Sequence, residues 1–479
     1  MNIQNDLKRL EEAREERAHS IVKIHLEACL ARVNDIHEAL DFIIENGKSQ
    51  RGIETRLREA VSAEVVEAAQ GLITVVEYAQ KMMSKQSLMV YVGTHWVRIR
   101  TQVFYDFVKD CAMKTGLGTA YVEQPDFMNK LFEQVAFRVA RDRELFVPKG
   151  QVWINMQNGT LEVHDDGTIR LRTHDKEDFF TYVLPYSYDP SARCDRWHAF
   201  LDRVMPEVAM QMAFGEYISS CLVPDMKLEK WAALYGKGAN GKSVATDVIT
   251  ELMGRENVSH VDLEKLTQDD NQRSMCEGKL ANISQENGPN VNYSVLKSYV
   301  SGEPLIVKRL YKDPAPMTHY GRLIASYNIL PKAENTHGNH RRWLLFPFDV
   351  TIPEAERDIH LKDRLCEELP GILNWVLECL QRLIENKGFT ESLGCKEALR
   401  KYVVNSNSAL RFLEERCVED ETGSFRLKDL YPEYLNFCHE EGVTNRFGRN
   451  SFGEQLENAG IRKHERAAGK VFYLKLKGE

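Results

Sequence analysis

A glycine-rich segment near the middle of the chain has the residue types and spacing of a phosphate-binding loop. Residues 230–250 read KWAALYGKGANGKSVATDVIT, so that Gly236 is followed, after four residues, by Gly241, Lys242 and Ser243. Glycines let successive backbone N–H groups turn inward around phosphate oxygens, where a side chain would clash. A lysine so placed bridges the β- and γ-phosphates, and the serine hydroxyl ligates Mg²⁺. The spacing therefore predicts a Walker A loop that binds ATP and Mg²⁺.

The segments on either side of this loop predict the strand and the helix that it requires. Trp231–Tyr235 is a short apolar run, and Val244–Met253 has the spacing of an amphipathic helix. A second Gly-Lys-Ser at 47–49 has Phe42 where the first glycine would stand, and it follows a helical segment, so we expect a surface turn there. The residues expected to contact the nucleotide are Gly236, Gly238, Asn240, Gly241, Lys242, Ser243 and Val244.

Polar residues at the ends of later segments fit the other requirements of nucleotide hydrolysis. Glu286 follows the apolar strand Leu280–Ser284, where an acid would join Ser243 in holding Mg²⁺ and would polarise the attacking water. Asn328 ends the strand-like stretch GRLIASYNILP, where an amide contacts the γ-phosphate or the water. Arginines 341 and 342 enter the next strand, and a cation there stabilises transition-state charge. Taken singly, Glu286 could be an exposed acid, Asn328 a strand-end cap and the two arginines a surface pair. Their order along the chain favours a single site.

The composition excludes several classes of protein. Apolar residues make up 43% and charged residues 28% of the 479 residues, and no apolar stretch is long enough to span a bilayer. The charged N-terminus lacks the apolar core of a signal peptide, so we expect a cytoplasmic protein without a membrane partner. The ten cysteines form no C-x-x-C pair, which argues for reduced, packed thiols. The net charge of −8 still permits nucleic-acid binding, because a ring can be acidic outside and basic along its channel.

Changes in residue pattern divide the chain into a helical region, a mixed α+β domain, a motor and a C-terminal domain. Helical spacing over about 4–45 and 53–83 predicts the first, and a hairpin turning near Gly93 begins the second. Further antiparallel strands in the second turn at Asn158-Gly159 and at Asp166-Gly167. The motor is expected to be an α/β P-loop domain of AAA+-like fold. The four segments are 1–87, 88–205, 206–394 and 395–479.

The C-terminal segment is expected to form a winged helix. Leu427–Glu440 and Ser451–Ala459 are its candidate helices, and KVFYLKLK is a terminal strand, with the wing tip at 467–469. Residues 443–479 hold eight Lys/Arg against four Asp/Glu, a net charge of +4. A structural cap with a basic surface is the alternative. The residues expected to contact DNA phosphates are Arg446, Arg449, Arg462, Lys463 and Arg466.

The compact order of loop, acid, amide and arginines resembles that of the superfamily 3 helicases, and within them the primase-helicases of satellite phages and poxviruses. The resemblance extends over about four-fifths of the chain, from residue 88 onward. Upstream, NGTLEVHDDG and THDKEDFFTYVLPYSYDPSARCDRWHAFLDRVMP are similar to the domain that precedes the motor in that group. Downstream, RRWLLFPFDVTIPEAERD and LKDRLCEELPGILNWVLECLQRL are similar to the segment that closes it.

The resemblance implies a role for each matching residue. Lys242 and Ser243 would be the Walker A pair, Glu286 the Walker B acid and Asn328 the sensor. One of the two arginines would be the finger that reaches a neighbouring subunit's nucleotide, and we expect both at the far edge of the sheet from their own loop. GEPLIVKRLYKDP resembles the family's DNA-tracking hairpin, and a solvated charge cluster is the alternative. The hairpin residues nominated for DNA contact are Lys308, Arg309 and Lys312.

Three observations limit the assignment. Many members of the superfamily carry two adjacent acids in Walker B, whereas Gln285 precedes Glu286 here. His337 and His340 lack cysteine or carboxylate partners in sequence, so we expect no metal site there. Residues 1–130 hold no D-x-D strand pair with a following histidine, so we expect no primase on this chain, and a primase or polymerase on a separate chain would be a partner.

The function that these patterns favour is an ATP-dependent replicative DNA helicase that moves on single-stranded DNA. The resemblance implies a homo-hexameric ring, 3′→5′ travel on forked DNA, and a phage, plasmid or mobile element as source. One alternative is a P-loop ATPase that remodels protein or packages DNA without unwinding it. Another is an origin-binding initiator in which the nucleotide drives only assembly.

Overall fold

The computed structural model describes residues 20–477 except 70, 79–84, 141–147, 149, 224–225, 286–289, 309–312, 332–339, 421–422, 445 and 467–468. The chain divides into two compact units, Met1–Asp189 and Pro190–Glu479.

The first unit combines helices and a small antiparallel sheet around one core. Apolar side chains from Val22 to Val139 form a single buried cluster, so residues on both sides of the expected boundary at 87/88 pack together. The sheet has the order β1-β2-β3 (Ile73–Tyr78, Lys85–Tyr91, Trp96–Arg98). The helices are 20–31, α2 (His37–Asn46), α3 (Gln50–Ala69), α4 (Thr101–Lys114), α5 (Thr119–Val122) and α6 (Pro125–Val139).

Several sequence predictions for this unit are confirmed and one is wrong. The hairpin turns at Gly93, whose φ is +86°, and Gly47-Lys48-Ser49 lies between two helices with an exposed lysine. The helical run expected up to residue 83 ends at Ala69 instead, and Ile73–Tyr78 is a strand paired with β2. Its β-branched residues favour a pleated strand, and the pairing with β2 decides the outcome.

A second antiparallel sheet of this unit has the order β4-β5-β6 (Gln151–Met156, Gly159–His164, Ile169–Arg172). Its first turn lies at 157–158, one residue earlier than predicted, because Met156 already pairs with Gly159. The 3₁₀ turn η1 (Lys176–Asp178) brings a carboxylate to Arg172, which donates to Asp178 at 2.7 and 2.8 Å and to Glu162 at 2.6 Å. This ion-pair network fastens the sheet to the segment that follows it.

The second unit is built on a parallel sheet with the order β13-β7-β12-β9-β8. The strand before the glycine-rich loop, β7, therefore lies between β12 and β13. Short apolar strands that are buried along their length are typical of parallel sheets covered on both faces. The strands are β7 (Trp231–Tyr235), β8 (Val258–Ser259), β9 (Ala281–Ser284), β12 (Arg322–Tyr327) and β13 (Trp343–Pro347).

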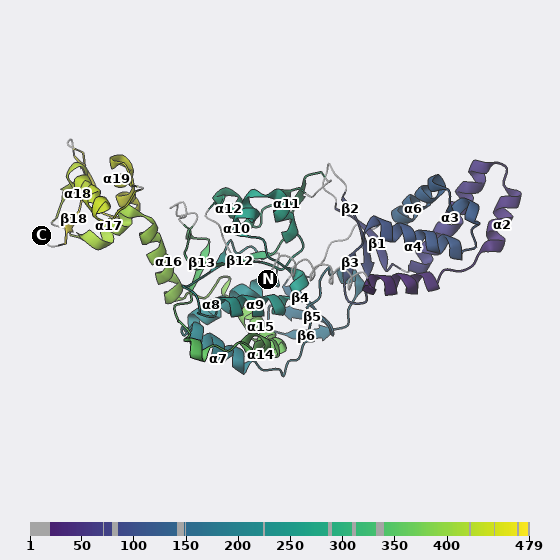
Figure 1. The fold of residues 1–479 in the computed structure, drawn as a ribbon, viewed down its shortest axis with the longest axis horizontal. Helices are drawn as coiled ribbons and strands as arrows, with labels where there is room; N and C mark the ends of the chain where they lie inside the picture. The colour runs from purple at the N-terminus through teal and green to yellow at the C-terminus, as the bar shows by residue number, and fades with distance from the viewer. Residues whose placement is uncertain are drawn as a thin grey trace. The chain divides into compact units, whose positions relative to one another are not determined.

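Helices cover both faces of this sheet, as Figure 1 shows. On one face Trp231, Leu323 and Leu345 pack against α10 (Leu263–Gln268) and α12 (Tyr293–Val300). On the other face Phe346 meets Phe214 of α8, with ring centroids 5.3 Å apart. The helices of this second face are α7 (Asp195–Val204), α8 (Val208–Ser220), α9 (Lys242–Met253), α14 (Leu361–Cys366) and α15 (Leu369–Asn386). The short helix α11 (Asp270–Arg273) follows α10. The unit is thus a mixed α/β fold around a parallel sheet.

A two-stranded antiparallel hairpin is inserted between β9 and β12 in the sequence. Its strands are β10 (Leu305–Val307) and β11 (Ala315–Met317), and Leu305 pairs with Met317. Leu305 and Val307 are buried, whereas Ile306 between them is 56% exposed. The alternation fixes the base of the hairpin to the domain and leaves one face of β10 open to solvent.

The helix α16 (Leu393–Ser406) belongs to the core of the parallel sheet. The ring of Tyr402 stacks on Trp343 of β13 at 5.1 Å, and its hydroxyl donates to Pro331 O at 2.6 Å. The expected boundary at 394/395 therefore falls inside a helix that the sheet needs. The last segment begins at Asn407, whose side chain caps α17 by accepting from the backbone N–H groups of Ala409 and Leu410.

From Asn407 onward the chain forms a separate small core of helices and short strands. Within it the rings of Tyr434 and Phe452 stack, and Phe412 from a third helix meets Phe452 edge to face. The predicted helix Leu427–Glu440 is confirmed, whereas KVFYLKLK is interrupted at Tyr473 and makes two strands. The elements are α17 (Ser408–Arg416), β14 (Cys417–Glu419), β15 (Phe425–Arg426), α18 (Leu427–Glu440), α19 (Arg449–Asn458), β16 (Lys463–Arg466), β17 (Gly469–Phe472) and β18 (Leu474–Leu476).

Two expectations from composition can be compared with the structure. The ten cysteines are all unpaired and eight of them are buried, as predicted for packed thiols. Among the described residues, no helix combines the length and the apolar character needed to cross a membrane.

Candidate nucleotide site

The loop between β7 and α9 has a backbone that requires glycine. A Cβ atom on Gly236 would lie 2.1 Å from Asn240 Nδ2 and 2.4 Å from Phe348 O. Gly238 and Gly241 have φ values of +105° and +89°, in the left-handed region that disfavours other residues. Tight turns of this kind orient successive backbone N–H groups to one side and form anion-binding concavities. The predicted strand, loop and helix are therefore present, with α9 beginning at Lys242.

Lys242 directs its ammonium group back into the loop. The residue is 6% exposed, and Nζ donates to Gly236 O at 2.5 Å, to Asn240 Oδ1 at 3.2 Å and to Asn328 Oδ1 at 3.3 Å. Burial lowers the pKa of this ammonium group from its ordinary value. None of the three acceptors is an anion, whereas charge-assisted bonds to phosphate are about twice as strong as neutral ones. The lysine is thus held by partners that a phosphate group can displace.

Two residues after β13 close the loop, and sequence reasoning missed both. Asn240 Nδ2 donates to Phe348 O at 3.0 Å, and Ile352 N donates to Ala239 O at 2.8 Å. Phe348 lies 108 residues beyond Asn240 along the chain and acts through its backbone. No local pattern in the sequence could have signalled this contact.

The strand order brings Asn328 to the loop. Since β12 lies directly beside β7, Gly236 N donates to Tyr327 O at 3.1 Å, and the next residue, Asn328, reaches Lys242. The predicted amide and the predicted lysine are therefore in contact, although 86 residues separate them in sequence.

The end of β9 lies near the first turns of α9. Gln285 Nε2 donates to Thr246 Oγ1 at 3.4 Å, and Ser243 is exposed while Val244 is half-buried. The predicted acid, Glu286, lies outside the described residues. The structure therefore places the residue before it close to the helix that carries the serine.

The two arginines lie at the amino end of β13. Trp231 N donates to Arg342 O at 2.9 Å, so the arginines are level with the start of β7 and the loop is at its other end. Five residues of β7 at about 3.3 Å each separate these ends by roughly 16 Å. The arginines do precede an edge strand, but β13 is the direct neighbour of β7, so the order of the strands does not separate them from the loop. The arginines are distant from their own loop because they stand at the opposite end of the strands.

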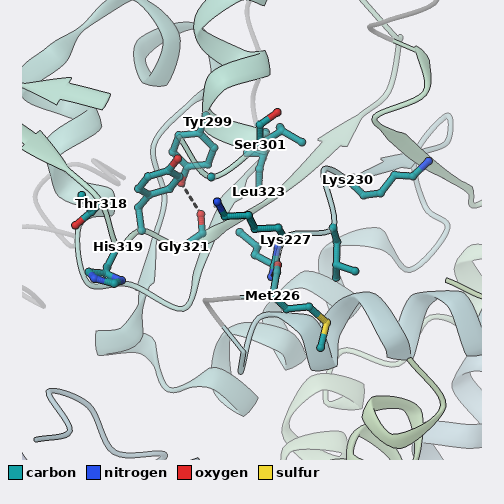
Figure 2. A pocket seen from close by; sticks show the side chains of 14 residues that line it. Met226, Lys227, Lys230, Tyr299, Ser301, Thr318, His319, Gly321 and Leu323 are labelled. Carbon is teal, nitrogen blue, oxygen red and sulfur yellow. Dashed lines mark hydrogen bonds between the residues drawn. The ribbon is translucent and has the colours of Figure 1, made fainter. Parts of the chain in front are cut away.

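A cavity of about 210 Å³ also lies at this amino end (Figure 2). Tyr299 in its wall donates its hydroxyl to Gly321 O at 2.5 Å, and Ser301 in its wall accepts from Arg342 Nη2 at 3.2 Å. Figure 2 shows Lys227 among the central side chains, while Lys230 points away from them. The cavity therefore adjoins the arginines and is separate from the glycine-rich loop.

The structure describes one of the three hairpin residues nominated for DNA contact. Lys308 is exposed directly after β10, and its backbone N–H lies 3.4 Å from Asp270 O. Arg309 and Lys312 lie outside the described residues.

The basic residues of the C-terminal segment differ in their surroundings. Arg446 and Arg449 are exposed before and at the start of α19, and Arg462 is exposed before β16. Lys463 is 2.7 Å from Glu457, which also pairs with Lys470 at 2.6 Å, so part of the basic charge is neutralised. The side chain of Arg466 and the wing-tip residues 467–468 lie outside the description, as does His337. Within the described part of the chain, no group of three metal-ligating side chains occurs, His340 included.

Comparisons with protein families match three parts of the chain. Residues 73–206 match the family described as D5 N terminal like, and residues 405–466 match the family described as poxvirus D5 protein-like. Residues 234–342, which hold the glycine-rich loop and the arginines, match a family of unknown function, DUF5906.

A putative helicase, L207/L206 of Acanthamoeba polyphaga mimivirus, is 24% identical over 161 residues. The match takes in 32% of this chain and 17% of that protein, so this chain spans a small part of its relative. Two structures of the NrS-1 C-terminal region, both 12% identical, give TM-scores of 0.46 and 0.45. They cover 85% and 81% of this chain, and 97% and 94% of their own.

Family matches thus lie before, across and after the parallel sheet, and a relative named as a helicase matches part of the same chain. The chain resembles the superfamily 3 helicases of the poxvirus primase-helicase type, as its motifs predicted.

Proposed function

We propose that the chain is an ATP-dependent DNA helicase of a replication system, and that it works as a ring on single-stranded DNA. The observation that carries the proposal is the position of Lys242. Its ammonium group lies inside a strand–loop–helix turn and touches Asn328 on the neighbouring strand. A buried cation whose partners among the described residues are neutral oxygens, at a helix N-terminus, fits a nucleotide phosphate.

The residues of the loop fit ATP and Mg²⁺ as a P-loop. Gly236 to Val244 would surround the phosphates, and Lys242 would exchange Gly236 O for phosphate oxygen. The exposed hydroxyl of Ser243 and the carboxylate of Glu286 would hold Mg²⁺. The metal would neutralise charge on the phosphates, while Asn328 would orient the attacking water or the γ-phosphate.

The position of the arginines supports the ring. Arg341 and Arg342 are about a strand's length from their own loop, so in this proposal they complete the site of another copy of the chain. An arginine supplied in trans accelerates hydrolysis by about 10³–10⁵ in other P-loop enzymes. A homo-hexamer on a DNA fork is the arrangement that the resemblance favours.

The DNA contacts of the proposal lie on the hairpin and on the C-terminal segment. Lys308, Arg309 and Lys312 would grip single-stranded DNA in the channel. The segment after Asn407 has helices α17, α18 and α19 followed by the antiparallel pair β16–β17, an arrangement that fits a winged helix. The exposed Arg446 and Arg449 would contact duplex phosphates there.

Strand displacement on a forked DNA substrate tests the proposal, with ATP hydrolysis measured in the same samples. The expected result is unwinding by the wild-type chain and none by the Lys242→Ala variant. ATP hydrolysis without unwinding would instead favour a P-loop ATPase that acts on protein or packages DNA. Nucleotide-dependent assembly on duplex DNA without hydrolysis would favour an initiator. Hydrolysis at the wild-type rate by Lys242→Ala would show that the nucleotide site is assigned to the wrong residues.

A further inference from the structure

Glu229, two residues before β7, is held in a backbone conformation that glutamate rarely adopts. Its φ is +48°, and its side chain is 50% exposed. Residues other than glycine stay in the left-handed region only where their surroundings determine them. The carboxylate Oε2 lies 3.3 Å from Arg341 Nη2 and 3.5 Å from Arg342 Nη2. One carboxylate oxygen therefore faces both arginines at the amino end of the sheet.

The two arginines are held very differently. The side chain of Arg342 is 14% exposed, and its Nη2 donates to Ser301 Oγ at 3.2 Å, while its carbonyl accepts from β7. The side chain of Arg341 is 57% exposed, and it reaches the same carboxylate from the solvent side. Arg342 is therefore an anchored cation, and Arg341 is free to move at its tip.

Positive charge is concentrated around this carboxylate. Lys230 Nζ donates to Arg341 O at 2.5 Å, and its pKa is lowered, first by burial and then by the charge of Arg341. Cations this close repel one another unless an anion lies among them. Glu229 supplies that anion, and it does so without enclosing the guanidinium of Arg341.

We propose that Arg341 is the residue that reaches the neighbouring subunit's nucleotide, and that Glu229, fixed by Arg342, is the positioning residue that aims it. This inference rests on the proposed function and assigns a separate role to each of the two arginines. A guanidinium has five N–H donors, so Arg341 keeps a bond to Glu229 while other donors face phosphate oxygens. An exposed ion pair changes an equilibrium by at most about fivefold, which is enough to orient the side chain without locking it.

Mixed rings test the inference, because they separate the subunit that donates the arginine from the subunit that receives it. The donor carries Lys242→Ala and keeps its arginines; the acceptor keeps Lys242 and carries Arg341→Ala with Arg342→Ala. ATPase in the mixture arises where an acceptor's nucleotide meets a donor's arginines. Glu229→Gln is then placed in the donor alone or in the acceptor alone. The matched control is Glu367→Gln, which removes an exposed carboxylate 2.8 Å from Arg196 elsewhere in the same unit.

Glu229→Gln in the donor is expected to lower kcat of the mixture about fivefold with KM unchanged, and in the acceptor to change neither. Glu229→Asp keeps the charge and tolerates a positive φ, so it should retain more of the rate. In the donor, Arg341→Ala should remove the restored activity, and Arg342→Ala should only reduce it.

Three results would overturn the inference. Equal losses of ATPase with Glu229→Gln in the donor and in the acceptor would mean that Glu229 has a local structural role. Unchanged ATPase with Glu229→Gln in the donor would mean that Arg341 is oriented without Glu229. A higher ATPase rate with Glu229→Gln in the donor would mean that Glu229 holds Arg341 away from the neighbouring nucleotide. Failure of the proposed function looks different: the wild-type chain itself would then not hydrolyse ATP, or Lys242→Ala would.

Discussion

Replacing Gly236 by alanine should open the contacts around Lys242 without changing any charge. The added methyl group would lie 2.1 Å from Asn240 Nδ2 and 2.4 Å from the backbone oxygen of Phe348. The amide of Asn240 can move aside, but the Phe348 carbonyl belongs to the main chain after β13. The clash therefore breaks the 3.0 Å bond between Asn240 and Phe348 and shifts the loop.

The size of the effect follows from these contacts. Forcing a methyl group into a packed site costs about 1–3 kcal/mol, and the broken hydrogen bond adds about 0.5–1.5 kcal/mol. A total of about 2–4 kcal/mol corresponds to a fall in Tm of roughly 5–10 °C for a domain of this size. A reacting group displaced by about 1 Å costs about 10²-fold in rate, so kcat/KM for ATP should fall by about that factor.

Thermal unfolding and ATPase assays on three variants check this prediction. Gly388→Ala is the control, since its Cβ would come no closer than 3.9 Å, to Asn386 O. Gly238→Ala meets nothing within 4 Å but has a φ of +105°, so its loss of about 1–2 kcal/mol should come from backbone strain alone. If Gly236→Ala unfolds at the same temperature as Gly388→Ala and hydrolyses ATP as fast, the close approach of Phe348 does not shape the loop.

Three other predictions concern the proposed activity. Lys242→Ala should lower ATPase by at least about 10²-fold while changing stability by about 1 kcal/mol or less, because its hydrogen-bond partners among the described residues are two oxygens of the loop and one of Asn328. A large loss of Tm would show a structural role. Joint neutral substitution of Lys308, Arg309 and Lys312 should uncouple ATPase from unwinding and reduce the salt slope of single-strand binding by about 2; unwinding that survives would make them solvated surface. Deletion of 407–479 should weaken duplex binding more than ATPase, because α16 remains on the sheet; unchanged duplex affinity in a gel-shift titration would leave the basic segment without a DNA role.

The sequence by itself determined the local elements of the candidate site. Glycine spacing marked the loop, the apolar run Trp231–Tyr235 marked its strand, and both agree with the structure. These features are readable because backbone freedom at glycine and the burial of a short strand act within a few residues. Sequence predicts less where pairing with a neighbouring strand decides the structure: the spacing of Ile73–Tyr78 fits a helix, but the segment is a strand beside β2.

Only the tertiary structure decided which of these elements meet. The strand order put Asn328 against Lys242, and it placed the arginines on the strand next to β7 but at its opposite end. No sequence pattern marks Glu229, because the role proposed for it depends on contacts with two arginines that lie more than a hundred residues later in the chain. Crossover connections set the order of parallel strands, and the apolar pattern of a strand does not record its neighbours. Local sequence motifs therefore identify the candidate reactive residues, whereas tertiary packing determines which residues they contact.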